Sequence, residues 1–315
     1  MSRRTIFVAG VVALVAALLT SCAGSMTTDP PPGATGPSPG CGTTTRGPVT
    51  DRAETISVAG TTRSYTITVP PSHVPGTDDP VPLVLDFHGL FEGLATTHPA
   101  ATQFSPKAAA EGFAVAYPIG SNGGINWDVS LQESNPDLRF IDTLVTDLER
   151  TLCIDRSRLY ITGLSYGAFM TSMLMCMRPN TFAAAAPVAG IQNACAVTDR
   201  KIPFVTFHGT ADPILPFSGF ADTPRAIAAK YGCAQPPTVT TLQPDPDPAT
   251  KGPITRTTWD CRAAGSDAVF YTIGGGGHSW LGSEFFGALG FIVGPTATSL
   301  DATDVIWDFF AAHHL

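Results

Sequence analysis

A serine held between two glycines is the residue whose surroundings point most clearly to chemistry. Gly163-Leu164-Ser165-Tyr166-Gly167 fits the pattern G-x-S-x-G. A strand-like run (Arg158 to Thr162) enters this motif and a helical run leaves it from Ala168, as a strained strand-to-helix turn requires. The glycines leave room for that turn. We therefore expect Ser165 to be a nucleophile at a helix N-terminus, where backbone N–H groups favour a developing oxyanion.

One histidine has the chain position of the base that a serine nucleophile needs. His278 follows a strand-like run, Val269 to Ile273, and a run of four glycines (274–277) that we expect to form a flexible loop. The alternative for a lone histidine is a surface or core side chain. His88 and His208 lie at strand ends, and His313 and His314 lie at the C-terminus, so none of these four has the chain position of a triad base. His278 is therefore the predicted general base.

The acid of a triad should lie between the serine and the histidine, after a strand. Asp212 meets this condition, because it follows the apolar run Phe204 to Phe207. There it can accept the Nδ1–H bond of His278 and fix the tautomer of the ring. Asp222 is the fallback. The chain order Ser165, Asp212, His278 is that of α/β-hydrolases rather than of the two well-known protease orders.

An oxyanion intermediate needs two N–H donors, and the sequence offers a pair. Tyr166 directly follows the nucleophile, and Leu90 lies in the loop after the apolar run Val81 to Phe87. Gly89 is the alternative to Leu90, because a shift of one residue is open at this stage. His88, Trp127 and Trp280 are the predicted substrate-binding residues, although aromatic side chains near a site are as often part of the core.

The elements that must position these residues alternate between strands and helices. Glu54 to Val58 and Arg63 to Val69 form a predicted hairpin about Ala59-Gly60. Apolar strand-like runs and helix-spaced runs then follow in alternation, which predicts a mostly parallel sheet with helices on both faces, the α/β-hydrolase fold. The predicted strands are 81–87, 113–117, 159–162, 184–188, 204–207 and 269–273, and the predicted helices are 100–112, 138–152, 168–176 and 302–313. The Pro-rich stretch 236–253 is predicted to be a surface excursion.

Composition excludes several classes of function. Of 315 residues, 43% are hydrophobic and only 14% charged, with a formal net charge of −8. That is enough apolar surface for one large core, and the lack of a basic cluster beyond the N-terminus argues against nucleic acid as a partner. No phosphate-binding loop, dinucleotide fingerprint or metal-ligand spacing occurs, so we expect no cofactor and no metal. We expect a monomer acting on a small-molecule or polymeric ester.

The N-terminus has the features of an export signal. Arg3 and Arg4 precede an apolar run, Ile6 to Leu19, that is too short to span a bilayer comfortably. It ends Leu19-Thr20-Ser21-Cys22, which resembles a bacterial lipobox. We expect a lipoprotein signal peptide at 1–21, a lipidated Cys22 with a flexible Pro/Gly/Thr-rich tether over 22–50, and a catalytic domain at 51–315. The protein would then lie at the outer face of the cytoplasmic membrane, within the cell envelope, with a fraction released.

Six cysteines remain after the lipid-bearing Cys22. An even number in an exported chain suggests up to three disulfides. Cys233 and Cys261 are expected to pair across the Pro-rich excursion. A weaker expectation pairs Cys153 with Cys195, which leaves Cys41 with Cys176.

Several stretches resemble the polyhydroxybutyrate depolymerase-type esterases, a group that includes feruloyl and acetylxylan esterases. The chain is similar to the mycobacterial-type lipoproteins of that group. The resemblance covers roughly residues 52–314 and implies the same triad of Ser165, Asp212 and His278. The chain departs from the group at Leu281, where Pro is more usual, and in lacking a Cys soon after Trp127. The matching stretches are 88–90, 127–128, 153–171, 182–190, 208–217, 274–282 and 306–313.

The sequence therefore predicts a secreted serine carboxylic-ester hydrolase that works through an acyl-enzyme. An acyltransferase on the same fold would use the same three residues, so the sequence does not separate the two. A non-catalytic surface protein on a hydrolase scaffold is the third hypothesis, and the intact triad argues against it. The natural acyl group and alcohol stay open.

Overall fold

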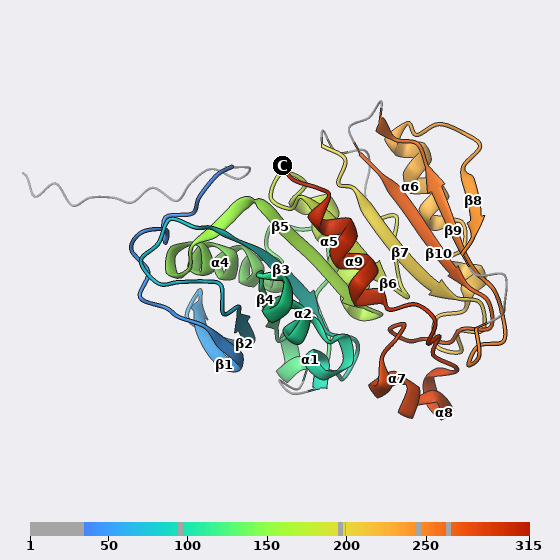
Figure 1. Ribbon diagram of the computed structural model, residues 1–315, viewed down its shortest axis with the longest axis horizontal. Coiled ribbons are helices and arrows are strands. Elements are labelled where there is room, and N and C mark those ends of the chain that lie inside the picture. The colour runs from blue at the N-terminus through green and yellow to red at the C-terminus, as the bar shows by residue number, and fades with distance from the viewer. Residues whose placement is uncertain (1–34, 94–96, 195–197, 199, 243–246, 263–265) are drawn as a thin grey trace, which may run out of the picture. The chain divides into compact units, whose positions relative to one another are not determined.

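The structure is a computed structural model that describes residues 35–315 except 94–96, 195–197, 199, 243–246 and 263–265. Strands and helices alternate along most of the chain (Figure 1). The strands are β1 (Val49–Val58), β2 (Thr61–Val69), β3 (Val81–Phe87), β4 (Ala114–Pro118), β5 (Ile154–Leu164), β6 (Ala184–Val188), β7 (Phe204–Gly209), β8 (Thr238–Thr241), β9 (Ile254–Trp259) and β10 (Ala268–Ile273). The helices are α1 (Thr97–Thr102), α2 (Phe104–Glu111), α3 (Ser121–Gly124), α4 (Pro136–Thr151), α5 (Tyr166–Met177), α6 (Thr223–Tyr231), α7 (Glu284–Ala288), α8 (Gly290–Val293) and α9 (Ala302–Ala311), with a 3-10 turn η1 (Phe217–Gly219).

The strands form one sheet in the order β1-β2-β4-β3-β5-β6-β7-β10-β9-β8. The six strands from β4 to β10 in this order pair in parallel. Antiparallel strands extend the sheet at both ends. The predicted mostly parallel sheet is confirmed, and its parallel strands all end at the same edge, where loops can bring distant residues together.

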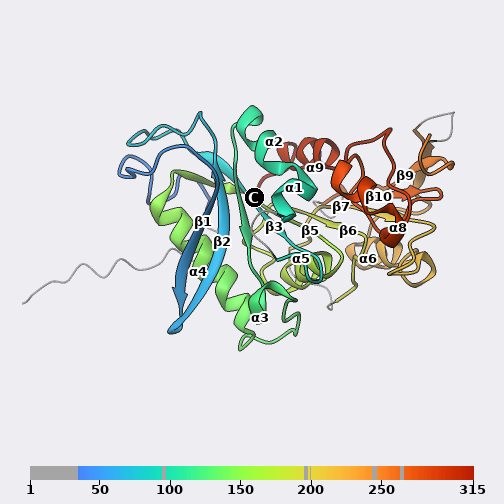
Figure 2. The same ribbon diagram turned by 90° about the horizontal axis from the view of Figure 1, so that it is seen from below.

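Helices cover both faces of the sheet (Figure 2). Helices α4, α5 and α6 contribute to one apolar cluster, whose members include Ile141, Met170 and Ile227. Helices α2 and α9 contribute to the other cluster, with Phe104 and Trp307. Because the central strands are buried on both sides, they are apolar throughout rather than alternating.

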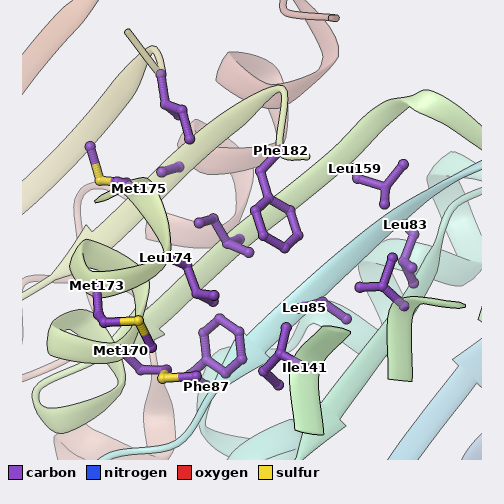
Figure 3. Close-up of a cluster of buried hydrophobic side chains, with 14 of the residues drawn as sticks. Leu83, Leu85, Phe87, Ile141, Leu159, Met170, Met173, Leu174, Met175 and Phe182 are labelled. Carbon is purple, nitrogen blue, oxygen red and sulfur yellow. The ribbon is translucent and has the colours of Figure 1, made fainter. Parts of the chain in front are cut away.

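The first of these clusters lies between α5, α4 and the central strand β3. Figure 3 shows Met170 and Leu174 of α5 facing Leu85 and Phe87 of β3, with Ile141 of α4 beside them. This packing fixes α5 against the strands on which the functional loops begin.

Two parts of the predicted element list are wrong in detail. The predicted helix 100–112 is two helices, because Gln103 adopts a left-handed backbone with φ 59° and separates α1 from α2. The Pro-rich excursion contains one further strand, β8, and is followed by another, β9, and neither was predicted. Every residue of β8 is exposed, so its sequence, Thr238–Thr241, carries no alternation of apolar and polar residues.

The predicted boundary of the tether at residue 50 is also wrong. Ser38 Oγ donates to Leu152 O at 2.9 Å and accepts the Ile154 N–H at 2.9 Å, and Ser38 is buried. Cys41 is covalently bound to Cys153. The Gly, Pro and Thr content of this segment predicts flexibility, but these long-range contacts fix it on the domain. Residues 1–34, with the predicted signal peptide and Cys22, lie outside the described residues.

The disulfides confirm one predicted pair and contradict the other. Cys233 bonds to Cys261 as expected. Cys153 bonds to Cys41 rather than to Cys195, so the weaker pairing and its remainder are wrong. Cys176 is also disulfide-bonded, and Cys195 lies outside the described residues.

No helix in the described part of the chain has both the length and the hydrophobicity of a membrane-spanning segment.

Candidate active site

Ser165 is the single residue between strand β5 and helix α5, and its backbone conformation is one that residues other than glycine rarely adopt. Its φ is 57° and its ψ is −114°. Such a residue stores strain, which persists only where the surroundings impose it. The two glycines of the motif explain how: a Cβ at Gly163 would lie 2.6 Å from Phe87 O, and one at Gly167 only 1.9 Å from the same atom. The predicted sharp turn is therefore present, and the close approach to β3 requires both glycines.

Asp212 and His278 meet in the loops that follow strands β7 and β10. His278 Nδ1 donates to Asp212 Oδ2 over 2.7 Å, and both side chains are buried. The donation of Nδ1–H leaves Nε2 as the basic nitrogen of the neutral ring. Because β5, β6, β7 and β10 are successive parallel neighbours, Ser165 follows a strand that ends at the same edge. The sequence prediction of an aspartate that orients His278 agrees with this geometry.

The carboxylate of Asp212 is saturated with donors. Oδ1 accepts the N–H groups of Ile214 and Leu215, each at 2.8 Å, and His208 Nε2 lies 3.3 Å from Oδ2. Burial alone would raise the pKa of Asp212, but the hydrogen bonds from His208 and His278 hold it well below its ordinary value. Asp212 is therefore ionised when it faces His278.

The glycine run before His278 is closely packed rather than a flexible loop as predicted. A Cβ at Gly277 would lie 2.1 Å from Val293 O, and one at Gly209 would lie 2.2 Å from Gly276 O. His278 N–H donates to Val293 O at 2.6 Å, which fixes the backbone directly behind the imidazole. The glycines allow backbone segments to touch and so hold His278 in place.

The loop after β3 contains Leu90, one of the two predicted oxyanion donors, and Tyr166, the other, begins α5. Gly89 N–H donates to Glu92 Oε2 at 3.0 Å, so it is already occupied. Within the described part of the chain, the N–H groups of Leu90 and Tyr166 donate to no protein acceptor. This distinction favours Leu90 over Gly89, the alternative that the sequence left open.

His88 fixes the peptide that carries the Leu90 N–H. Its Nδ1 donates to Gly89 O at 2.7 Å, and its Nε2 accepts the Gly120 N–H at 2.9 Å. Burial lowers the pKa of His88 to about 4, so the ring is neutral near pH 7. Gly89 O and Leu90 N–H belong to one planar peptide and point in opposite directions. The Glu92 N–H also donates to Gly89 O at 3.2 Å, so His88 and the Glu92 backbone together fix where the Leu90 N–H points.

The three predicted substrate-binding side chains are instead internal. His88, Trp127 and Trp280 are each at most 2% exposed, so none of them lines a cleft open to solvent, and that prediction is wrong. Trp127 Nε1–H donates to His88 O at 2.9 Å, and Trp280 Nε1–H donates to Thr303 Oγ1 at 2.9 Å. An indole that finds an internal acceptor is stable in a core, and this is the packing alternative recognised from the sequence.

The sequence analysis missed the roles of two residues near the site. His208 contacts Asp212, and the Glu92 side chain accepts the N–H of Gly89 in the loop after β3. A sequence signal was present for each, because His208 lies near the end of β7 and Glu92 follows β3, at the edge where the triad lies. Phe91, in the same loop as Leu90, is 70% exposed and so is available to a substrate. In the described residues, no group of three or more His, Cys, Asp or Glu side chains is arranged to hold a metal ion.

Comparison with known proteins finds hydrolases. A family model described as the prolyl oligopeptidase family matches residues 102–213, which include Ser165 and Asp212 but end before His278. Among solved structures, the acetyl xylan esterase from Aspergillus awamori superposes with a TM-score of 0.58 at 18% identity, covering 72% of this chain and 94% of that one. This superposition confirms the predicted α/β-hydrolase fold.

The sequence relatives carry esterase names. NocK of Nocardia uniformis subsp. tsuyamanensis, which has an esterase name, is 28% identical over 326 residues, covering 92% of this chain and 93% of that protein. Feruloyl esterase D of Neurospora crassa is 26% identical over 259 residues, covering 78% and 83%. Feruloyl esterase C of Emericella nidulans is 27% identical over 176 residues, and the match spans 54% of this chain and only 63% of that protein. The predicted resemblance to the feruloyl and acetylxylan esterases is confirmed, and it supports a serine carboxylic-ester hydrolase with the α/β-hydrolase fold.

Proposed function

We propose that this protein cleaves carboxylic esters with Ser165 as nucleophile, His278 as general base and Asp212 as the residue that orients the histidine. The observation that carries the proposal is the 2.7 Å contact between Asp212 Oδ2 and His278 Nδ1. It lies at the sheet edge where Ser165 occupies its strained turn. A buried carboxylate, an oriented imidazole and a serine at a helix N-terminus form the set that acyl transfer needs.

The proposed reaction has two halves. In the first, His278 Nε2 takes the proton of the Ser165 hydroxyl as its oxygen bonds to the ester carbonyl carbon. The tetrahedral oxyanion then collapses, the alcohol leaves with the proton from the imidazolium, and an acyl-serine ester remains. In the second half, water attacks that ester by the same route, releasing the acid and restoring Ser165.

The N–H groups of Leu90 and Tyr166 are the proposed oxyanion donors. Tyr166 is the first residue of α5, where the helix leaves N–H groups without partners and its dipole favours negative charge. Leu90 contributes from the opposite loop, with its peptide fixed by His88. Removal of one such donor typically costs about a hundredfold or more in kcat.

A panel assay tests the reaction and narrows the substrate. Purified protein is offered short p-nitrophenyl esters, methyl ferulate, acetylated xylan and hydroxybutyrate oligomers, each beside the Ser165→Ala variant. We expect hydrolysis of at least one ester class that is lost in the variant. Product analysis with an added alcohol acceptor separates hydrolysis from acyl transfer, since a transferase would form the new ester in preference to the free acid. No turnover of any ester would contradict the proposal.

The disulfides indicate an exported protein, because such bonds persist in oxidising compartments. We further propose that Cys22 carries lipid and holds the domain at the outer face of the membrane. Since residues 36–50 pack on the domain, the spacer is shorter than predicted and ends near residue 35. The test is detergent partitioning of wild type and Cys22→Ser. Wild type should enter the detergent phase and the variant should not, whereas aqueous partitioning of both would mean that Cys22 carries no lipid.

A further inference from the structure

A line of charged side chains runs from the central sheet toward the loop that carries Leu90, with Asp86 and His98 buried and Glu92 partly buried. It begins at Asp86, near the end of β3, whose side chain is fully buried. Asp86 Oδ1 accepts the Nε2–H of His98 at 2.9 Å, and Oδ2 accepts the hydroxyl of Thr102 at 2.6 Å. His98 and Thr102 are one turn apart on α1, so both side chains lie on the same face of that helix. Helix α1 ends there, before Gln103, and its contacts with Asp86 do not involve α2.

The second nitrogen of His98 faces Glu92. His98 Nδ1 has no hydrogen-bond partner in the described chain, and Glu92 Oε2 lies 3.8 Å from it. Burial alone would lower the pKa of His98, but Asp86 and Glu92 raise it. The imidazole therefore lies between two carboxylates, and its proton-bearing form attracts both.

Glu92 completes the line at the oxyanion loop. Its Oε2 accepts the Gly89 N–H at 3.0 Å, and a Cβ on Gly89 would lie 2.8 Å from that oxygen. Burial raises the pKa of Glu92, against the lowering influence of His98 and the Gly89 N–H. The next anchors along the loop, Phe91 N–H to Ile125 O at 2.8 Å and Gly93 N–H to Gly124 O at 3.1 Å, lie beyond Leu90. Among the described contacts, Gly89 is held by the side chains of His88 and Glu92 and by the Glu92 N–H, which donates to Gly89 O at 3.2 Å. Of these contacts in the described residues, only that of the Glu92 side chain is made to the Gly89 N–H.

We propose that Glu92, supported by His98 and Asp86, is a positioning residue that holds Gly89 so that the Leu90 N–H meets the oxyanion. The inference rests on the proposed esterase function. A carboxylate that acts through Gly89 affects the donor, which is used in the transition state, and it does not touch the ground-state ester. Its removal should therefore lower kcat and leave KM nearly unchanged.

The test separates the effect of side-chain length from the effect of negative charge at position 92. Glu92→Gln keeps an oxygen at the same distance, Glu92→Asp keeps the charge but withdraws it by one methylene, and Glu92→Ala removes both. Glu111→Ala is the matched control, because Glu111 is a surface carboxylate on α2 that pairs with Lys107 away from the site. Initial rates with p-nitrophenyl acetate give kcat and KM for each variant, and circular dichroism gives Tm.

We expect Glu92→Ala and Glu92→Asp to lose about 10- to 100-fold in kcat with KM within about twofold of wild type. Glu92→Gln should recover most of the activity, and Glu111→Ala should match wild type. If Glu92→Ala does not fold, the comparison of Glu92→Asp with Glu92→Gln decides. Wild-type kcat in Glu92→Asp, or equal losses in the Asp and Gln variants, would overturn the inference while the esterase proposal stands. An inactive wild type, or an active Ser165→Ala, would instead overturn the esterase proposal and this inference with it.

Discussion

His208 and His278 approach the same oxygen of Asp212. His278 Nδ1 lies 2.7 Å and His208 Nε2 3.3 Å from Oδ2. His208 Nε2 also lies 2.9 Å from Leu215 O, and a carbonyl can only accept, so this nitrogen carries the hydrogen. The imidazole of His208 stacks on the ring of Phe220, and the two ring centroids are 5.1 Å apart. The Nε2–H of His208 therefore donates to Leu215 O and also faces Asp212 Oδ2, and packing fixes the ring that carries it.

Loss of the His208 N–H, which lies between Leu215 O and Asp212 Oδ2, should weaken the orientation of Asp212. His208→Phe keeps the aromatic packing and removes the donor, and we expect a fall in kcat of about tenfold. His208→Gln keeps an N–H donor and should retain more activity. Steady-state kinetics of both variants provide the check. Full activity of His208→Phe would mean that the amides of Ile214 and Leu215 hold Asp212 without help.

The triad candidates could be predicted because each has a local signature. Ser165 lies in a glycine-flanked turn, and Asp212 and His278 each follow an apolar strand, so chain order and strand position identify them. Parallel strands end at one edge, and this rule alone brings the three loops together.

The supporting contacts could not be predicted, because they depend on which segments are neighbours in space. His88 binds Gly120 only because β3 lies beside β4 in the sheet. Cys41 lies 112 residues from Cys153 in sequence, and no local pattern relates them. The sequence also does not show which side chains are covered by neighbouring segments. For this reason Trp280 was predicted to bind substrate, although it packs in the core.

Gly167 should be intolerant of a methyl group. An alanine usually stabilises a helix by about 1 kcal/mol over a glycine. At Gly167, however, a Cβ would lie 1.9 Å from Phe87 O, so we expect Gly167→Ala to lower the free energy of unfolding by more than about 2 kcal/mol. Gly219 has nothing within 4 Å of such a Cβ and serves as the matched control. Urea unfolding of both variants measures the difference, and equal stabilities would refute the close packing of α5 on β3.

The disulfide between Cys41 and Cys153 should be a major source of stability. The bond joins residues 112 apart, and closing a loop of that size lowers the entropy of the unfolded chain enough to stabilise the fold by about 5 kcal/mol. Cys41→Ser with Cys153→Ser should lower the urea midpoint accordingly, and a chain shortened to begin at residue 45 should be similarly weak. Peptide mapping without reduction gives the direct check. A Cys153–Cys195 peptide would contradict the structure.

His88 should make the fold sensitive to mild acid. Burial lowers its pKa to about 4, against about 6.5 for an unfolded histidine, so the unfolded chain binds the proton more readily. The free energy of unfolding should therefore be highest above about pH 6.5 and fall toward pH 4, by up to about 3 kcal/mol from this residue. In His88→Gln the difference between pH 7.5 and pH 4.5 should shrink, whatever the absolute stability. Identical pH dependence in urea unfolding would show that His88 does not titrate as described.

The central claim is that Ser165 becomes acylated. Wild type is mixed with a fluorophosphonate, which forms a stable adduct on an activated serine, and the labelled peptide is found by mass spectrometry. We expect one adduct on Ser165, none in Ser165→Ala, and strongly slowed labelling in His278→Ala, with ester hydrolysis falling by roughly a thousandfold or more in both variants and somewhat less in Asp212→Asn. Undiminished hydrolysis by Ser165→Ala, or an adduct on another residue, would contradict the proposed mechanism.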